Sequence, residues 1–86
     1  MNHFIIIVVR ALMAKCNLVI DGFDIRIEYP VYIKGMYKIY FDNVWIGYVY
    51  YRIDHLESPS KIWYATTDYT QLYLVELSLF LESVDP

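Results

Sequence analysis

Residues 37–52 read YKIYFDNVWIGYVYYR, in which two aromatic, apolar runs flank an Asp-Asn pair. Aromatic and β-branched residues favour strands, and a two-residue turn at Asp42 and Asn43 is typical of a β-hairpin. Folding the runs about this turn gives one face that we expect to be core. Its members are Phe41, Ile39 and Tyr37, opposed by Val44, Ile46 and Tyr48, with Tyr50 beyond.

The reverse face of the same hairpin lacks the polar side chains of an ordinary exposed face. In this register Tyr40 opposes Trp45, and Lys38 opposes Gly47, which leaves a notch beside the aromatic pair. The face consists of Met36, Lys38, Tyr40, Trp45, Gly47, Val49 and Tyr51. We therefore expect another layer, a second copy or a partner to cover it.

A second hairpin is predicted at Asp21 and Gly22, another strong two-residue turn signal. Its apolar face pairs Ile20 with Phe23, Leu18 with Ile25 and Cys16 with Ile27; its other face carries Asn17, Val19, Asp24, Arg26 and Glu28. Pro30 ends this hairpin because proline cannot donate to a ladder. Residues 61–67 (KIWYATT) predict a further short strand, and the β-branched residues 4–10 (FIIIVVR) favour a strand at the beginning.

The C-terminal segment predicts a helix. Asp68 with Gln71 resembles a capping box, and Leu and Glu favour helix over residues 69–83. The expected buried stripe is Tyr73, Leu74, Leu77, Phe80, Leu81 and Val84, and a second apolar patch beside Glu76 is Leu72, Val75 and Leu79. If the segment were a strand instead, the protein would be an all-β barrel or sandwich.

The predicted fold is therefore α+β. It consists of a small antiparallel sheet of four to six strands, with hairpins at 21–22 and 42–43, and a C-terminal helix packed on one face. Residues 1–86 form a single small domain. Met13 could be the true start, because the chain from there keeps every hairpin signal, and residues 1–12 would then be dispensable.

Composition indicates more apolar side chain than so small a domain can hide. The chain is 58% hydrophobic and 19% aromatic, and a domain of this size buries only about 60–65% of its unfolded surface. Cys16 is the single cysteine, so no internal disulfide compensates. We expect a homodimer, or a surface that binds another protein.

The charge distribution is uneven. The net charge is −3. In residues 54–86 the only Lys or Arg is Lys61, and the six acids are Asp54, Glu57, Asp68, Glu76, Glu82 and Asp85. Such a flank repels phosphate and favours a basic protein surface. Arg10 interrupts the N-terminal apolar run, which predicts neither an export signal nor a membrane span. A cytoplasmic location is the expectation.

No residue pattern predicts catalysis. Cys16 falls on a core face, where a free cysteine usually behaves as a small hydrophobic residue. The sequence indicates no activating environment for Cys16 beside His3 or His55, nor for Ser58 or Ser60 beside His55. The spacing of Asp54, His55 and Glu57 matches no metal site, and the glycines are isolated, so they form no phosphate cradle. We expect no enzyme activity, no metal and no cofactor.

The first functional hypothesis is a non-enzymatic protein-interaction module that inhibits or assists a larger protein. Its predicted partner-binding residues are Lys38, Tyr40, Trp45 and Tyr51 on the sheet, and Leu72, Val75 and Leu79 on the helix. A phage or mobile-element inhibitor of the anti-CRISPR kind is one concrete form, an analogy from size and composition. The alternative is a protein that binds RNA or single-stranded DNA by Tyr and Trp stacking, for which few basic residues are at hand.

Overall fold

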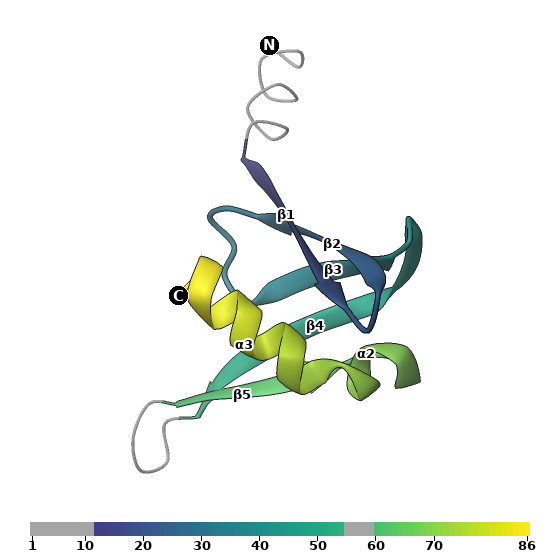
Figure 1. Cartoon of the computed structure of the whole chain (residues 1–86). Coiled ribbons are helices and arrows are strands. Elements are labelled where there is room, and N and C mark those ends of the chain that lie inside the picture. Colours follow the sequence, from purple (N-terminus) through teal and green to yellow (C-terminus); the bar gives the residue numbers. More distant parts are fainter. Residues whose placement is uncertain (1–11, 55–59) are drawn as a thin grey trace.

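The computed structural model describes residues 12–54 and 60–86. The strands are β1 (Met13–Ile20), β2 (Phe23–Pro30), β3 (Met36–Phe41), β4 (Val44–Asp54) and β5 (Ser60–Ala65), and the helices are α2 (Asp68–Leu72) and α3 (Leu74–Val84). The strands form one open antiparallel sheet in the order β1-β2-β3-β4-β5. Both helices lie on one side of it (Figure 1).

The predicted α+β class is confirmed, and the all-β alternative is wrong because residues 74–84 are helical. The strand expected at residues 4–10 lies outside the described residues, as do His3, His55, Glu57 and Ser58. The dispensability of residues 1–12 stays a prediction. Neither of the described helices is long enough, or apolar enough, to cross a bilayer.

The β1–β2 hairpin has the predicted register, with Cys16 opposite Ile27 and Leu18 opposite Ile25. Asp21 and Gly22 both have positive φ, of 52° and 81°, as a turn that follows the right-handed twist of the strands requires. Alternation then places one apolar set toward the helices and the polar set on the other side.

The β3–β4 hairpin has the predicted turn but not the predicted register. Phe41 opposes Val44 and Tyr40 opposes Trp45, but Ile39 then pairs with Gly47, so Ile46 is one extra residue in β4. Such a bulge moves every following side chain to the opposite face, because side chains alternate along a strand. The assignment of Tyr48 and Tyr50 to the core face was therefore wrong.

Beyond the bulge, Val49 is fully buried, although the predicted register placed it on the reverse face. Lys38 opposes Tyr48 rather than Gly47, and Met36 opposes Tyr50. The sequence contains no direct signal for the bulge, because either register keeps apolar residues on both faces of β4.

Gly47 is the residue that permits this bulge. Its φ is +138°, and a Cβ there would lie 2.9 Å from both Thr66 Oγ1 and Thr67 Cγ2. Those side chains are held in place, since Thr67 Oγ1 donates to the Ile46 carbonyl (2.7 Å) and Thr66 Oγ1 accepts from the Tyr48 N–H (2.9 Å). The predicted notch beside Tyr40 and Trp45 is therefore wrong: the space next to Gly47 holds the connection from β5 to α2.

The predicted helix exists, but it begins one residue earlier and is divided in two. Thr67 is the N-cap of α2, and its side chain forms a capping box with Thr70, not Asp68 with Gln71. Thr70 is fully buried beneath this turn. Tyr73 separates the helices with φ −106° and ψ 15°, outside the helical range.

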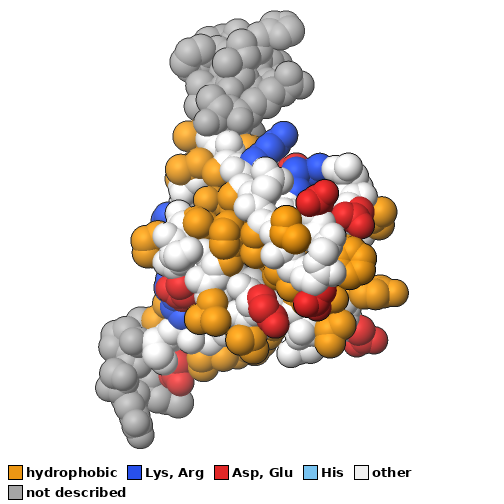
Figure 2. Space-filling model, viewed as in Figure 1, with side chains coloured by type: hydrophobic (Ala, Val, Ile, Leu, Met, Phe, Trp, Pro, Cys, Tyr) orange, Lys and Arg blue, Asp and Glu red, His pale blue; other side chains and the backbone are white. Residues whose placement is uncertain are grey.

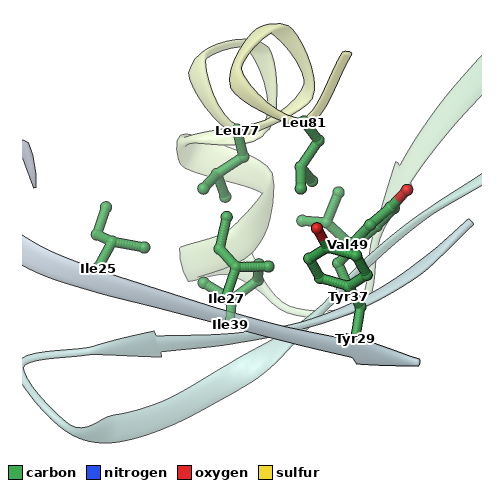
Figure 3. Close-up of a cluster of buried hydrophobic side chains, with 8 residues drawn as sticks. All are labelled: Ile25, Ile27, Tyr29, Tyr37, Ile39, Val49, Leu77 and Leu81. Atoms are coloured by element: carbon green, nitrogen blue, oxygen red, sulfur yellow. The ribbon is translucent and has the colours of Figure 1, made fainter. Parts of the chain in front are cut away.

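The core lies between α3 and the sheet. Leu77 and Leu81 point from α3 onto the buried side chains of β2, β3 and β4 (Figure 3), which are Ile25, Ile27, Tyr29, Tyr37, Ile39 and Val49. Tyr73, Leu74 and Phe80 pack at the edge of this cluster, as the predicted stripe requires. Val84 does not: it is 42% exposed beyond the last core turn.

Polar contacts attach the end of α3 to the sheet. The Asp85 carboxylate accepts hydrogen bonds from the Tyr37 hydroxyl (2.8 Å) and from Lys34 Nζ (2.7 Å). Partial burial disfavours its charge, but these two bonds outweigh that cost, so the pKa of Asp85 lies below its ordinary value. Burial, and then the bond to Asp85, raise the pKa of Tyr37 far above its ordinary value.

Candidate functional site

We call the side of the sheet opposite α2 and α3 the open face, because no described element packs on it. Strand alternation, reset by the bulge at Ile46, directs one aromatic residue of β3, three of β4 and one of β5 to this side. These rings are Tyr40, Trp45, Tyr48, Tyr50 and Tyr64. Trp45 is 50% exposed and Tyr64 38%; the other three are half-buried.

The rings of the open face contact one another. Tyr50 and Tyr64, directly opposite in β4 and β5, are stacked with their centroids 5.3 Å apart and their planes at 18°. Trp45 meets Tyr48 edge to face, with centroids 5.7 Å apart. These geometries are favourable for aromatic pairs, so they hold the rings in place before any partner arrives.

Cationic side chains lie over the same rings. The Arg26 guanidinium carbon lies 4.2 Å from the centroid of the Tyr40 ring. Lys38 Nζ approaches that ring from 5.7 Å. Arg52 lies near both stacked tyrosines, 5.9 Å from Tyr50 and 5.8 Å from Tyr64. The open face is therefore an aromatic surface with fixed positive charges.

Hydrogen bonds to two neighbouring side chains also fix the position of Arg26. Its Nε donates to the Glu28 carboxylate (2.9 Å), and its Nη1 donates to Asn43 Oδ1 in the β3–β4 turn (2.6 Å). The guanidinium thus lies over the Tyr40 ring with two of its five N–H donors engaged. This arrangement fixes the Tyr40 end of the open face.

The two sides of the sheet differ in charge. Four of the seven Lys and Arg residues occupy open-face strand positions: Lys15, Arg26, Lys38 and Arg52. Asp24, Glu28 and Asp54 are acids on the same face. The helices carry Asp68, Glu76 and Glu82, with Asp85 at the end of α3, and no base. The acids of α2 and α3 therefore lie on the opposite side of the sheet from the basic strand positions.

The structure brings together three of the four sheet residues predicted to bind a partner. Lys38, Tyr40 and Trp45 are neighbours on the open face, as expected. Tyr51 is not: it lies on the helix-covered face, edge to face with Trp63 at 5.0 Å. The bulge is the cause, since it reverses the direction of every β4 side chain after Ile46.

Sequence reasoning missed Tyr48, Tyr50 and Tyr64. Tyr64 follows Trp63 in KIWYATT, so strand alternation alone could have placed these two rings on opposite faces. The face to which Tyr48 and Tyr50 point depends on the bulge, so these two residues could not be assigned to the open face without knowing of it. Leu72, Val75 and Leu79 are exposed on the helices, at 70%, 68% and 67%, and they lie on the opposite side from the open face.

The described residues offer little for covalent or metal chemistry. Burial, and then the nearby Asp85 charge, raise the pKa of the Cys16 thiol, which disfavours the reactive thiolate. In the described part of the chain no three His, Cys, Asp or Glu side chains gather as a metal site would require. Comparisons with protein-family models, with curated proteins and with solved structures found no match to this chain.

Proposed function

We propose that this protein is a non-enzymatic interaction module that binds another protein through the open face. The observation that carries the proposal is the cluster of Tyr40, Trp45, Tyr48, Tyr50 and Tyr64 with Arg26 and Arg52 on a face that no described element covers. Trp, Tyr and Arg are the residues that most often dominate binding energy at protein interfaces. Five such rings and two such guanidiniums far exceed the scattered apolar residues of an ordinary surface.

The preorganisation of the rings also supports protein binding. Aromatic side chains that already pack against each other lose little conformational entropy on binding, which favours affinity. The open-face strand positions hold four Lys and Arg residues against three acids, and the bases that lie over the rings suit a partner surface that carries carboxylates. A small protein of this kind would act as an inhibitor or accessory subunit of a larger one, because it contributes a surface rather than a reaction.

Single-stranded nucleic acid is the second candidate, favoured by the four basic residues at open-face positions. Two features speak for protein instead. Base stacking needs free ring faces, whereas Arg26 lies on Tyr40, and Tyr50 and Tyr64 lie on each other. Arg26 is also engaged by Glu28 and Asn43, so phosphate would compete with existing bonds.

The test compares two double variants as baits in cells that produce the protein. Tyr40→Ala with Trp45→Ala removes the open-face anchors, and Tyr32→Ala with Ile33→Ala, at exposed apolar positions between β2 and β3, is the matched control. Chemical crosslinking and quantitative mass spectrometry would identify partners, after far-UV circular dichroism confirms that both variants fold. We expect a partner held by the wild type and the control, and at least a tenfold loss with the open-face variant.

The proposal would be contradicted if the open-face double variant bound the same partners as the wild type and self-associated to the same extent. A titration with single-stranded oligonucleotides separates the second candidate. Nucleic acid binding would weaken steeply with salt and would drop on Lys38→Glu, because counterion release dominates such complexes. Sizing with light scattering over a wide dilution range would detect the homodimer expected from composition, which the same double variant should dissolve if two open faces meet.

A further inference from the structure

A second surface lies on the helix side of the molecule, where α2 meets the ends of β2, β3 and β4. It contains a groove of about 360 Å³. The lining is almost entirely apolar and consists of Phe23, Phe41, Asp42, Val44, Ile46, Tyr69, Leu72 and Tyr73. None of these residues belongs to the set of rings that defines the open face.

Packed aromatic rings form the floor of this groove. Phe41 packs on Tyr73 with centroids 4.9 Å apart, and on Phe23 with centroids 5.8 Å apart. Around this floor the walls are exposed: Leu72 by 70%, Tyr69 by 67% and Val44 by 64%. A groove with a packed aromatic floor and apolar walls is suited to one bulky apolar side chain from a partner.

The apolar surface continues along the helices. Leu72 ends α2, and in α3 the exposed Val75 and Leu79 are four residues apart, a spacing that keeps both on one side of that helix. The groove and these residues together form what we call the groove-and-stripe surface. An apolar groove continued by such a stripe matches the way in which amphipathic helices are bound, by anchors at i, i+3 or i+4, and i+7.

The charges next to this surface have one sign. Asp42 lines the groove, Asp68 precedes Tyr69, and Glu76 follows Val75. Glu82 pairs with Lys61, but neither Asp68 nor Glu76 has an ion pair or a side-chain hydrogen bond in the described part of the chain. Figure 2 shows the helix side with hydrophobic side chains interspersed by Asp and Glu.

We propose that the groove-and-stripe surface binds a basic amphipathic helix of another protein. A bulky apolar side chain of that helix enters the groove, further apolar residues cover Val75 and Leu79, and Lys or Arg face Asp68 and Glu76. A second copy is a poor occupant, because two such surfaces would bring their acids together. This binding is independent of the open face, which lies on the other side of the sheet.

The test uses two synthetic helix-forming peptides. Both carry Leu and Phe at i, i+3, i+4 and i+7; one has Lys at the remaining positions and the other has Glu. Isothermal titration would measure binding, and amide chemical shifts would locate it. We expect the Lys peptide to bind at α2, α3 and the β3–β4 turn, and the Glu peptide to bind at least tenfold more weakly.

Four variants make the test specific. Leu72→Glu places a charge at the groove wall and should weaken the Lys peptide at least tenfold, whereas Val19→Glu, at a residue 66% exposed on the open face, should not. Glu76→Lys should reverse the preference between the two peptides. Trp45→Ala should leave peptide binding unchanged, so failure of this proposal is distinguishable from failure of the open-face proposal.

Equal affinity for the two peptides would overturn the proposal, as would an absence of binding or an unchanged affinity in the Leu72→Glu variant. A homodimer that Leu72→Glu dissolves would overturn it too, because the surface would then be an interface between copies. Both glutamate variants introduce charge at exposed positions, so thermal unfolding should show that they stay folded.

Discussion

The two faces of the sheet use tyrosine in different ways. On the helix-covered face Tyr37 is fully buried, its ring lies 5.1 Å from that of Tyr29, and its hydroxyl donates to Asp85. On the open face Tyr50 and Tyr64 stack on each other beneath Arg52, with Tyr64 38% exposed. The first arrangement stabilises the fold, and the second leaves aromatic area for a partner.

The comparison shows that residue type does not determine the role of an aromatic side chain here. A tyrosine ring is apolar enough for a core, and its hydroxyl is polar enough for a surface. Which role it takes depends on the direction of its Cβ, and that direction depends on register. In β4 one extra residue, Ile46, decides it for every ring that follows.

The largest expected difference between the faces comes from truncating one tyrosine on each. Tyr37→Ala should lower the free energy of unfolding by about 3–5 kcal/mol, because it empties a buried site and removes one of the two donors to Asp85. Tyr64→Ala should cost about 1 kcal/mol or less, since its ring is already partly in water. Urea denaturation of both variants measures this, and equal losses would refute the division into a structural and a free face.

The second prediction concerns Gly47, the residue that permits the bulge in β4 and so sets which side chains lie on each face. Gly47→Ala should lower the free energy of unfolding by about 2–4 kcal/mol, from strain at positive φ and from overlap with Thr66 and Thr67. The matched control is Gly22→Ala, which has φ +81° but nothing within 4 Å of the new Cβ, and should cost about 1–2 kcal/mol. A Gly47 variant no worse than the control would mean that the bulge tolerates a side chain.

The smallest expected effect concerns the polar contacts at the end of α3. Asp85→Asn should lower the free energy of unfolding by about 1–2 kcal/mol at pH 7, because the carboxylate accepts from Lys34 and Tyr37. The pKa of Asp85 is lowered by folding, so its contribution is present above the unfolded value, about 3.9, and is lost as pH falls through the folded value.

The difference in stability between wild type and the Asp85→Asn variant should therefore be full above about pH 3.9 and should disappear once the pH falls below the lowered pKa of Asp85. Thermal unfolding across pH 2 to 7 measures the difference. A difference in stability that stays constant with pH would show that the charge of the Asp85 carboxylate does not attach α3 to the sheet.

Much of the fold was predictable, and the reason is local. The turns at 21–22 and 42–43 need positive φ, which Asp, Asn and Gly adopt most readily. The helix followed from its Leu and Glu content and from its apolar stripe, of which only Val84 was misplaced. The candidate site was only partly predictable: Lys38, Tyr40 and Trp45 lie before the bulge and were placed correctly, whereas Tyr51 lies after it and was not.

The sequence by itself determined the strands, the two hairpin turns, the helical C-terminal segment and the excess of aromatic side chains, because each depends on neighbouring residues. Only the tertiary structure decided which aromatics are buried and which are free. The conformation of Gly47 is stable because Thr66 and Thr67, some twenty residues later in the chain, fill the space next to it and bond to β4. A contact between distant segments thus set the register, and the register set the two faces.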